Sequence, residues 1–409
     1  MTSILNKTKP VQKDFSSDEA LALSIDLKLS VASYNILRSV TGLHGYDIYP
    51  SYHNLLESKK LCYPDIITIN DERAEVDLQS LLDHTSTRLI QSLNYDAIGD
   101  FEHICLISKY GMDGTTGLST YKFKESQHLQ EGSIFVISIM PIRLMGIKKS
   151  NQAETIIWNN NRTSSTRMCR PIALIYGKET KELIIAEANN LKDKIENLLT
   201  TKVNCKNSNV DINHQLIFTM IDGKVMQVLT DTKSAMTCVY CGVTPKDMNN
   251  LKTKDVNIDA LKYGLSPLHA YIRFFECVLH IAYRIDIKLW RVTKENKEKL
   301  ESKKAKIQND FRKDLGLIID VPSPGGSGTS NDGNSARCFF EEYEISARIT
   351  GVNVELIRRL GVILKTINCR FDIDASKFDA YCHETFKLYI KHYDWFKMPR
   401  TMHQILAHG

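Results

Sequence analysis

Apolar residues recur with a helical period in the first part of the chain. The stretch SSDEALALSIDLKL opens with Ser16 and Glu19, which match the S-x-x-E capping box found at helix starts. The spacing predicts further helices in SVASYNILRSV, in PSYHNLLESKKL after Pro50, and in DLQSLLDHTSTRLIQSLN. The first hundred residues are therefore expected to be mainly helical.

The pattern changes to a strand type from residue 101. HICLISKY, SIFVISIMPIRL and PIALIYG are rich in β-branched and aromatic residues and end at turn formers. TKELIIAEANNLKDKIENLL then has the spacing of an amphipathic helix, and HQLIFTMI is a further expected strand. Three strands, a helix and a strand in this order are typical of an α/β domain.

Helical spacing returns after residue 240. SPLHAYIRFFECVLHIAYRIDIKLW has Ser266 as an expected N-cap and Pro267 at the first helical position. KENKEKLESKKAKIQNDFRK is highly charged and predicts a solvent-exposed helix, and SPGGSGTSNDGNSARCFF predicts a glycine-rich loop that leads into another helix. The apolar face expected for the first of these helices comprises Leu268, Ile272, Phe275, Leu279 and Ala282.

The composition is that of a globular protein. The 409 residues suggest about two to four domains, and 43% apolar residues supply ample core. A net charge of +5 is compatible with nucleic-acid binding but does not by itself indicate it. MTSILNKTKPVQKDF lacks the apolar segment of a signal peptide, no run of 18 apolar residues occurs, and the ten cysteines are scattered. We therefore expect no membrane segment and a reducing compartment.

Two aspartates follow expected strands at matching places. Asp113 follows HICLISKY in KYGMDGTTG, and Asp222 follows HQLIFTM in MIDGKVMQVL. Because Asp-Gly is a favoured hairpin turn, a plain turn is the simpler interpretation of each. If adjacent strands bring the two carboxylates together, they are candidates to bind two Mg²⁺ or Mn²⁺ ions for phosphoryl transfer. This chemistry normally needs a third carboxylate.

Four candidate metal ligands lie in two pairs. Cys238 and Cys241 form C-x₂-C in TCVYCGVTPKDMN, and His403 and His408 form H-x₄-H in MHQILAHG. Two thiolates and two imidazoles are a ligand set of structural tetrahedral zinc sites. Residues 242–402 lie between the pairs, far more than in a zinc finger. The alternative is two unrelated motifs, with both histidines on one face of a terminal helix.

The order of the motifs resembles one family of DNA-rearranging enzymes. A helical first segment is followed by KYGMDG, WNNNRTSSTRMCRPIALIYG, MIDGKV, CVYCGVTPKDMN, SGTSNDGNSARCFF and FKMPRTMHQILAHG. This order is similar to that of the Transib transposases and the related catalytic subunit of the V(D)J recombinase, over nearly the whole chain. The resemblance implies an α/β fold: an RNase H-like catalytic core with a large helical zinc-binding insertion and an N-terminal helical DNA-binding and dimerisation segment.

The resemblance assigns roles to individual residues. Asp113 and Asp222 match the first and second catalytic aspartates, which bind Mg²⁺ or Mn²⁺. The two cysteines and two histidines match the four ligands of a structural zinc ion. The stretch GNSAR is similar to one that contacts DNA in the family, and basic residues of the first helices are further candidates. The candidate DNA contacts are Arg38, Lys59, Lys60, Asn334 and Arg337.

Five segments are expected on this basis. Residues 1–64 form a helical dimerisation and DNA-binding segment, 65–100 a helical connector, 101–235 the core with both aspartates, 236–320 the Cys-x₂-Cys half of the zinc insertion, and 321–409 its helical His-x₄-His half. For the first segment, a purely structural helical domain is the simpler alternative.

The family's third acid, a glutamate downstream of the second zinc histidine, has no counterpart in this sequence. Only Gly409 follows His408, and Glu341, Glu342 and Glu344 lie inside the insertion, where they are not expected to replace it. Two-metal transfer depends on fixed ion geometry, so the chain as given is expected to cleave DNA poorly.

The function that the resemblance implies is DNA transposition in the nucleus. A homodimer would bind terminal inverted repeats in duplex DNA, nick them, form hairpins and transfer strands; no accessory protein can be named from the sequence. Two alternatives remain open. One is a non-catalytic, transposase-derived DNA-binding or dimerising protein, and the other is a zinc-stabilised interaction scaffold.

Overall fold

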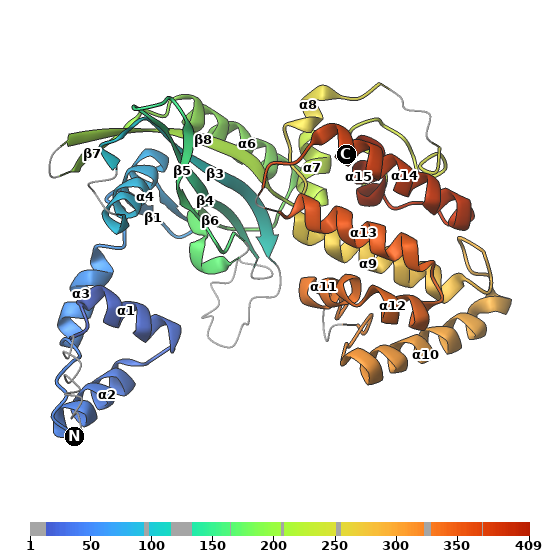
Figure 1. The fold of residues 1–409 in the computed structure, drawn as a ribbon, viewed down its shortest axis with the longest axis horizontal. Coiled ribbons are helices and arrows are strands. Elements are labelled where there is room, and N and C mark those ends of the chain that lie inside the picture. The colour runs from blue at the N-terminus through green and yellow to red at the C-terminus, as the bar shows by residue number, and fades with distance from the viewer. Residues whose placement is uncertain are drawn as a thin grey trace, which may run out of the picture. The chain divides into compact units, whose positions relative to one another are not determined.

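The computed structural model shows a mixed α/β protein with one curled sheet and many helices (Figure 1). It describes residues 14–93, 98–115, 133–163, 165–205, 208–250, 255–322, 329–369 and 371–409. The chain divides into two compact units. The first contains the residues up to Thr68 together with those from Val76 to the end of α4, and the second contains Ile69–Glu75 and everything from Ile98 onward.

The first unit is helical, as the sequence predicts. Ser16 Oγ accepts a hydrogen bond from the Glu19 amide, and the Glu19 carboxylate accepts one from the Ser16 amide, so the expected capping box is present. Ala20, Tyr34 and Leu55 form a small buried core. All four expected helices are confirmed: α1 (Ser17–Asp26), α2 (Val31–Leu43), α3 (Tyr52–Lys60) and α4 (Leu78–Ser92). The last of them lies in the 65–100 segment that was expected to be a connector.

Eight strands of the described residues form one sheet in the order β1-β2-β6-β4-β3-β8-β7, with β5 paired to β4. The central strand β3 pairs antiparallel with β4 and parallel with β8. The expected strands are confirmed as β3, β4, β6 and β8, whereas the short strands β1, β2, β5 and β7 were not expected. Their bounds are β1 (Ile67–Ile69), β2 (Arg73–Val76), β3 (Phe101–Thr115), β4 (Ile134–Lys148), β5 (Glu154–Asn159), β6 (Arg170–Tyr176), β7 (Thr201–Cys205) and β8 (Ser208–Ile221).

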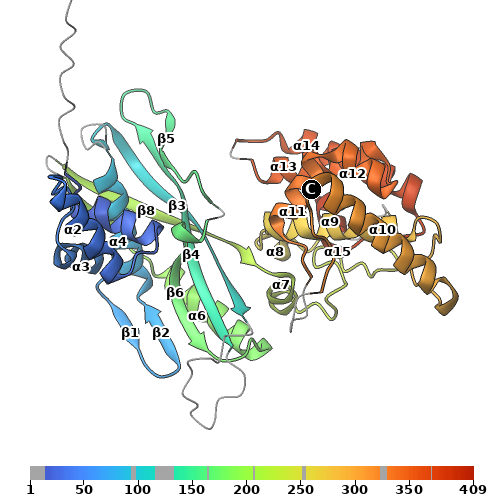
Figure 2. The ribbon, with the colours of Figure 1, turned by 90° about the horizontal axis from the view of Figure 1, so that it is seen from below.

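Helix α6 (Lys181–Glu196) follows β6 and packs beside the sheet (Figures 1 and 2). Its side chains Ile184 and Leu191 are buried in the core. The Arg73 guanidinium of β2 donates to both carboxylate oxygens of Glu187 on α6, at 2.6 and 3.0 Å. Because Glu187 is buried, this bidentate ion pair compensates its charge and ties the helix to strand β2.

The regular elements of the described residues beyond β8 are helices, and α9 lies in their midst (Figure 1). Ser266 accepts from the His269 amide and Pro267 opens α9, as predicted. Phe275, Leu279 and Ala282 are buried, but Leu268 remains 45% exposed because it lies in the first turn, beside an open cleft. The helices are α7 (Gly223–Leu229), α8 (Ile258–Leu261), α9 (Pro267–Arg284), α10 (Lys297–Leu315), α11 (Gly333–Glu341), α12 (Tyr343–Thr350), α13 (Val354–Ile367), α14 (Ala375–Tyr393) and α15 (Arg400–His408), with single turns of 3₁₀ helix at η2 (Thr166–Met168) and η3 (Lys294–Asn296).

Helix α10 confirms the prediction for the charged stretch. Only Ile307 and Phe311 of its nineteen residues are buried, and the remainder face solvent wholly or in part. No helix in the described part of the chain combines the length and the apolar character that a membrane span requires.

Candidate metal centre and acidic cleft

The two cysteines and two histidines singled out in the sequence meet in the folded chain. One ligand atom from each of Cys238, Cys241, His403 and His408 lies within 4.8 Å of the others. Cys241 Sγ is 3.5 Å from His403 Nε2, and Cys238 Sγ is 3.8 Å from His408 Nε2. The four residues therefore form a cluster suited to a metal ion such as zinc.

A tight turn presents the two thiols. The Cys238 amide donates to the Val243 carbonyl at 2.9 Å, and the Gly242 amide donates to the Cys238 carbonyl at 2.9 Å. Gly242 has a φ of +65°, a left-handed conformation that favours glycine. This turn folds the chain back so that both sulfur atoms face α15.

The imidazole of His403 is oriented by the backbone. Its Nδ1 is 2.9 Å from the Met248 carbonyl oxygen, which can only accept a hydrogen bond, so Nδ1 carries the proton. In the neutral ring of this tautomer, Nε2 is the nitrogen free to bind a metal ion, and it is turned toward the thiols. A second hydrogen bond of this kind is the usual way in which a metal-binding histidine is held in one tautomer.

The two thiols are electrostatically unequal. The hydrogen bond with Cys238 lowers the pKa of Cys241 strongly, and contacts with His403 and His408 lower it further, against the effect of burial. The same hydrogen bond, together with burial, raises the pKa of Cys238. The pair thus presents one sulfur that deprotonates readily, and a thiolate is the form that binds metal.

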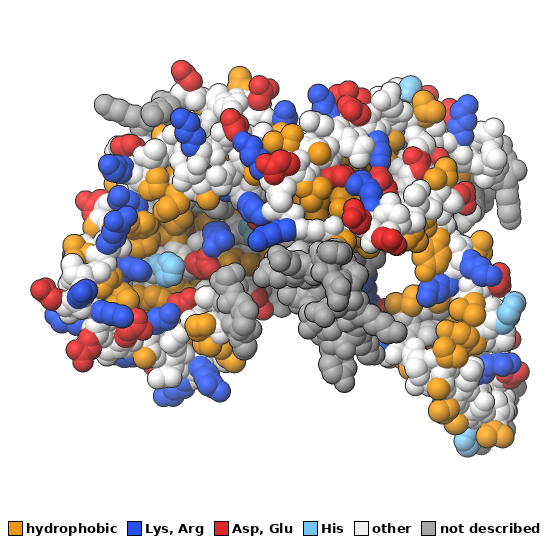
Figure 3. Space-filling view, turned by 180° about the vertical axis from the view of Figure 1, so that it is seen from behind, with side chains coloured by type: hydrophobic (Ala, Val, Ile, Leu, Met, Phe, Trp, Pro, Cys, Tyr) orange, Lys and Arg blue, Asp and Glu red, His pale blue; other side chains and the backbone are white. Residues whose placement is uncertain are grey.

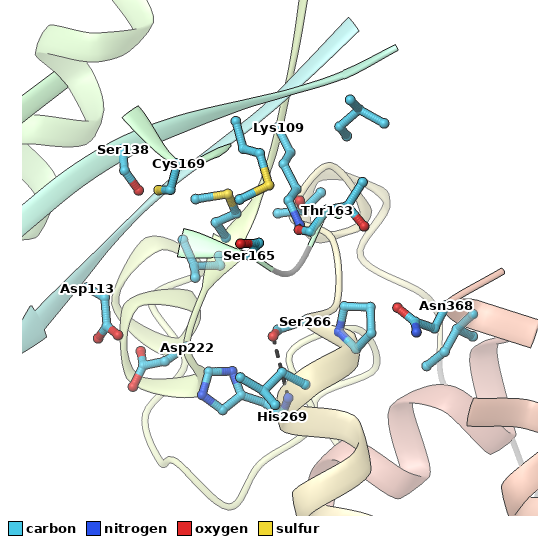
Figure 4. Close-up of a pocket in the computed structure, with 18 of the residues that line it drawn as sticks. Lys109, Asp113, Ser138, Thr163, Ser165, Cys169, Asp222, Ser266, His269 and Asn368 are labelled. Carbon is cyan, nitrogen blue, oxygen red and sulfur yellow. Dashed lines mark hydrogen bonds between the residues drawn. The ribbon is translucent and has the colours of Figure 1, made fainter. Parts of the chain in front are cut away.

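The two aspartates also come together, at one edge of the sheet. Asp113 lies near the end of β3, opposite Val136 of β4, and Asp222 follows β8 directly. Because β3 and β8 are parallel neighbours, their carboxyl ends share an edge. Figure 4 shows the two carboxylates pointing toward one another, with His269 beside Asp222. The simpler interpretation as two hairpin turns is wrong: Asp113 lies within a strand, and Asp222 caps a helix.

Asp222 is anchored by its own helix. Its Oδ1 accepts hydrogen bonds from the Lys224 and Val225 amides, at 2.9 and 2.8 Å, so it is the N-cap of α7. This leaves Oδ2 without a capping role. The carboxylate is thus fixed in place while one oxygen faces the cleft.

A third carboxylate, Glu179, belongs to this edge and was not singled out in the sequence. It lies between β6 and α6, and its Oε2 would be 2.8 Å from a Cβ placed on Gly114. Oε2 pairs with Lys224 Nζ at 3.0 Å, while Oε1 is buried without a hydrogen-bond partner. Strands β6 and β3 are both antiparallel to β4, so they are parallel to each other and their carboxyl ends lie at the same edge. An acidic residue shortly after PIALIYG was therefore the sequence signal that could have identified Glu179.

The carboxylates repel one another. Desolvation in the cleft raises the pKa of Asp113 most, and the charges of Asp222 and Glu179 raise it further. His269 opposes this effect only in part. A site where like charges raise a pKa gains free energy from a bound cation. Among the described residues, however, the Cys/His cluster is the one group of three or more such ligand atoms as close as 4.8 Å.

A cleft of about 560 Å³ extends from Asp113 and Asp222 toward α13. Three basic side chains, Lys109, Arg143 and Arg337, are part of its lining, together with polar and many apolar side chains. Lys109 Nζ donates to the Thr163 carbonyl at 2.8 Å, and burial lowers the pKa of Lys109. The cleft therefore combines an acidic end with three basic side chains in a lining that is largely apolar.

Of the candidate DNA contacts in the described residues, Arg337 is the one that lines the cleft. Arg38 Nε donates to the Tyr49 carbonyl at 3.2 Å, Lys60 pairs with Glu57 at 2.8 Å, and Lys59 is exposed in the last turn of α3. All three belong to the first unit, whereas Asn334 and Arg337 lie on α11 of the second. Arg337 lies over the Tyr271 ring, 5.4 Å from its centre. Residues 323–328 of the expected glycine-rich loop lie outside the described residues.

None of the three glutamates considered as substitutes for a third acid lines the cleft in the described residues. Glu341, Glu342 and Glu344 are exposed at the junction of α11 and α12.

Comparison with known proteins does not assign the chain to a family. No protein-family model matches the chain, and a search of curated proteins finds no match either. The structure defines a mixed α/β protein that brings two cysteines and two histidines together in a potential metal centre, beside a separate acidic cleft.

Proposed function

We propose that the chain is a Transib-like transposase with an RNase H-like core, in which the acidic cleft handles DNA. The observation that carries this proposal is the pairing of Asp113 and Asp222 at the ends of two parallel neighbouring strands. Glu179 adds a third carboxylate to the same edge. A cleft with carboxylates at one end and basic residues in its lining suits a phosphodiester and the divalent ions that act on it.

Zinc is the metal that best fits the Cys/His cluster. Cys238, Cys241, His403 and His408 would hold it as a closed tetrahedral site with no position for substrate, which is a structural role. It would join α15 to the turn that follows α7. The Cys/His cluster would differ in function from the Asp113 and Asp222 pair, because thiolate and imidazole ligands do not suit the Mg²⁺ expected at the aspartates.

Asp113 and Asp222 would hold Mg²⁺ or Mn²⁺ at the cleft. Oxygen ligands are the type these ions prefer. Burial, and then the charges of Asp222 and Glu179, raise the pKa of Asp113, and a bound cation would relieve the repulsion among these carboxylates. Such ions, when bound, activate a water molecule and stabilise the leaving oxygen. The protein's own part is positional: the helix cap fixes Asp222, and Lys109 and Arg337 line the path of a phosphate backbone.

DNA binding and self-association are assigned to the first unit. Lys59 and Lys60 lie in the last turn of α3, and Arg38 lies on α2.

An apolar face of α2 is the candidate surface for self-association. Ile36, Val40 and Leu43 are 63%, 46% and 87% exposed and share this face. Hydrophobic side chains gather on the surface of this unit in Figure 3. An apolar helical face of this kind suits a second copy of the chain, and a Leu43→Glu change should shift the protein to monomer in light scattering.

The test separates binding at the cleft from catalysis. Mn²⁺ binding to zinc-loaded protein, followed by electron paramagnetic resonance, should be lost in Asp113→Ala and in Asp222→Ala. Nicking of repeat-end DNA with Mg²⁺ and then Mn²⁺ should be weak and should disappear in Asp113→Ala. Mn²⁺ binding that neither substitution changes would contradict the proposal.

One observation favours a second candidate, a zinc-stabilised DNA-binding or interaction protein without catalysis. In the described part of the chain, only the Cys/His cluster brings three or more ligand atoms within 4.8 Å. This candidate predicts that the Cys/His cluster binds zinc and that the cleft binds no Mn²⁺. Salt-dependent binding of duplex DNA then distinguishes a DNA-binding protein from a scaffold.

A further inference from the structure

We propose that Arg400 couples the Cys/His cluster to the acidic cleft, by holding the Gly223 carbonyl and thereby the position of Asp222. Arg400 is a positioning residue in this role, since it touches the backbone beside Asp222 rather than a substrate. The inference rests on the proposed function of the cleft and adds a structural route by which the first metal site controls the second.

The coupling begins with one direct contact. Arg400 opens α15, and its Nη2 donates a hydrogen bond to the Gly223 carbonyl oxygen at 3.0 Å. Gly223 follows Asp222 and is the first residue of α7. A Cβ on Gly223 would lie 2.4 Å from Arg400 Nη2, so the guanidinium occupies the space that a side chain would need. Glycine at this position allows the close approach.

Arg400 lies on the same helix as two members of the Cys/His cluster. His403 and His408 lie three and eight positions after Arg400 on α15. Met402 and Leu406 of the same helix are buried in the core. The start of α15 is therefore fixed by whatever fixes its histidines. A metal ion held by all four ligands would hold α15 against the turn after α7.

The guanidinium lies within the electrostatic reach of both sites. Burial lowers the pKa of Arg400, while the charges of Cys238 and then Asp222 raise it. Nη1 is buried without a hydrogen-bond partner, which adds to the cost of burying the guanidinium. The guanidinium is thus near one residue of each site, Cys238 of the cluster and Asp222 of the cleft.

The first turn of α7 is held from two directions. Lys224 Nζ bonds to the Glu179 carbonyl oxygen and to its carboxylate, each at 3.0 Å, which ties α7 to the sheet edge. Arg400 ties the preceding residue to α15. The amides of Lys224 and Val225 in turn cap Asp222. If the α15 contact is lost, α7 keeps the Glu179 tie, and Asp222 loses part of its support.

The experiment uses the full chain loaded with zinc and compares four variants. Arg400→Met removes the donor and keeps most of the apolar stem, and Gly223→Ala should displace the guanidinium with Arg400 still present. Arg400→Lys restores a donor and should recover part of the effect. Lys391→Met, an exposed position on α14, is the control for loss of one positive charge.

The coupling predicts weaker Mn²⁺ binding with zinc retained. In Arg400→Met and Gly223→Ala, Mn²⁺ affinity at the cleft should fall about tenfold, the lower end of what loss of a supporting contact costs a metal site. Zinc content and the control variant should match the wild type. Unchanged Mn²⁺ affinity in zinc-loaded Arg400→Met overturns the inference, and so does a parallel loss of zinc, which would place the role of Arg400 in the cluster alone.

A second readout separates this inference from the proposed function. If wild-type protein binds no Mn²⁺ through Asp113 and Asp222, the proposed function fails, and amide hydrogen exchange of α7 decides the coupling. Faster exchange over Lys224–Leu229 in Arg400→Met than in Lys391→Met supports it. Equal exchange in the two variants refutes it.

Discussion

Cys241 Sγ lies 3.5 Å from His403 Nε2, although the two residues are 162 positions apart in the chain. The contact joins the turn after α7 to the helix α15, and nearly the whole helical part of the second unit lies between them. Closing a loop of this length costs conformational entropy that a bound metal ion would offset. The stability of this unit should therefore depend on the cluster.

Removal of the cluster metal should destabilise the helical part. Metal centres of this ligand type contribute on the order of 10 kcal/mol of apparent binding free energy near neutral pH. Cys241→Ser should bind less than one zinc per chain, and a chelator should lower the thermal midpoint of the wild type toward that of the variant. Elemental analysis and thermal unfolding measure both. Cys369→Ser, at an exposed cysteine, should keep its zinc; loss of zinc there as well would contradict the assignment.

Asp113→Asn should stabilise the metal-free protein at neutral pH. The folded state raises the pKa of Asp113 above its usual value of 3.8, so the protonated form is favoured by folding. That contribution is complete below pH 3.8 and is lost as the pH rises through the folded pKa, which leaves a repelled carboxylate at pH 7. The thermal midpoint of the variant should exceed that of the wild type at pH 7, and the difference between the two midpoints should be smaller at pH 4.

Divalent ions supply the control for this effect. Mg²⁺ should raise the midpoint of the wild type at pH 7 and leave Asp113→Asn unchanged, because binding requires the ionised carboxylate. Asp211→Asn, at an exposed position of β8, should behave as the wild type does. A wild type that gains nothing from Mg²⁺ would count against a cation at Asp113.

Gly111→Ala should damage the edge that carries both aspartates. A Cβ on Gly111 would lie 1.9 Å from the Met220 carbonyl oxygen, where β3 and β8 shift register. The clash is with backbone, so the strands must separate next to Asp113 and Asp222, at a cost of about 3 kcal/mol or more. Urea unfolding measures the loss. Gly99→Ala, with open space around the new Cβ, should unfold like the wild type.

Arg73→Met should cost about 3–5 kcal/mol of unfolding free energy, because it leaves the buried Glu187 carboxylate without its bidentate partner. The double variant Arg73→Met with Glu187→Leu should recover much of this loss, since no unpaired charge remains. Urea unfolding of both variants is the measurement. A double variant no more stable than Arg73→Met would show that packing, rather than charge, is responsible.

DNA affinity should fall steeply with salt, and single basic residues should account for part of the slope. Lys59→Ala and Arg337→Ala should each reduce the slope of log affinity against log salt by about 1, as expected for loss of one phosphate contact. Fluorescence anisotropy at several salt concentrations measures this slope. Lys59→Arg keeps the charge and should keep the slope; a slope unchanged in Lys59→Ala would remove α3 from the DNA surface.

Much of the secondary structure could be predicted from local sequence. The capping box at Ser16, the Ser266–Pro267 start of α9 and the β-branched runs of β3, β4, β6 and β8 act within a few residues, so the linear order suffices. The short strands β2 and β7 could not be predicted, because RAEV and TKVNC are only four and five residues long and take their extended form from the strands they pair with.

The sequence by itself determined which side chains were available: two aspartates after strands, a pair of cysteines and a pair of histidines. Only the tertiary structure decided which of them meet. Parallel pairing of β3 with β8 brings Asp113 to Asp222, and the direction of β6 adds Glu179. Packing of α15 on α9 and α14 brings the histidines to the thiols of the turn after α7 and Arg400 to Gly223. These contacts depend on strand direction and on the packing of elements distant in the sequence, and local periodicity encodes neither.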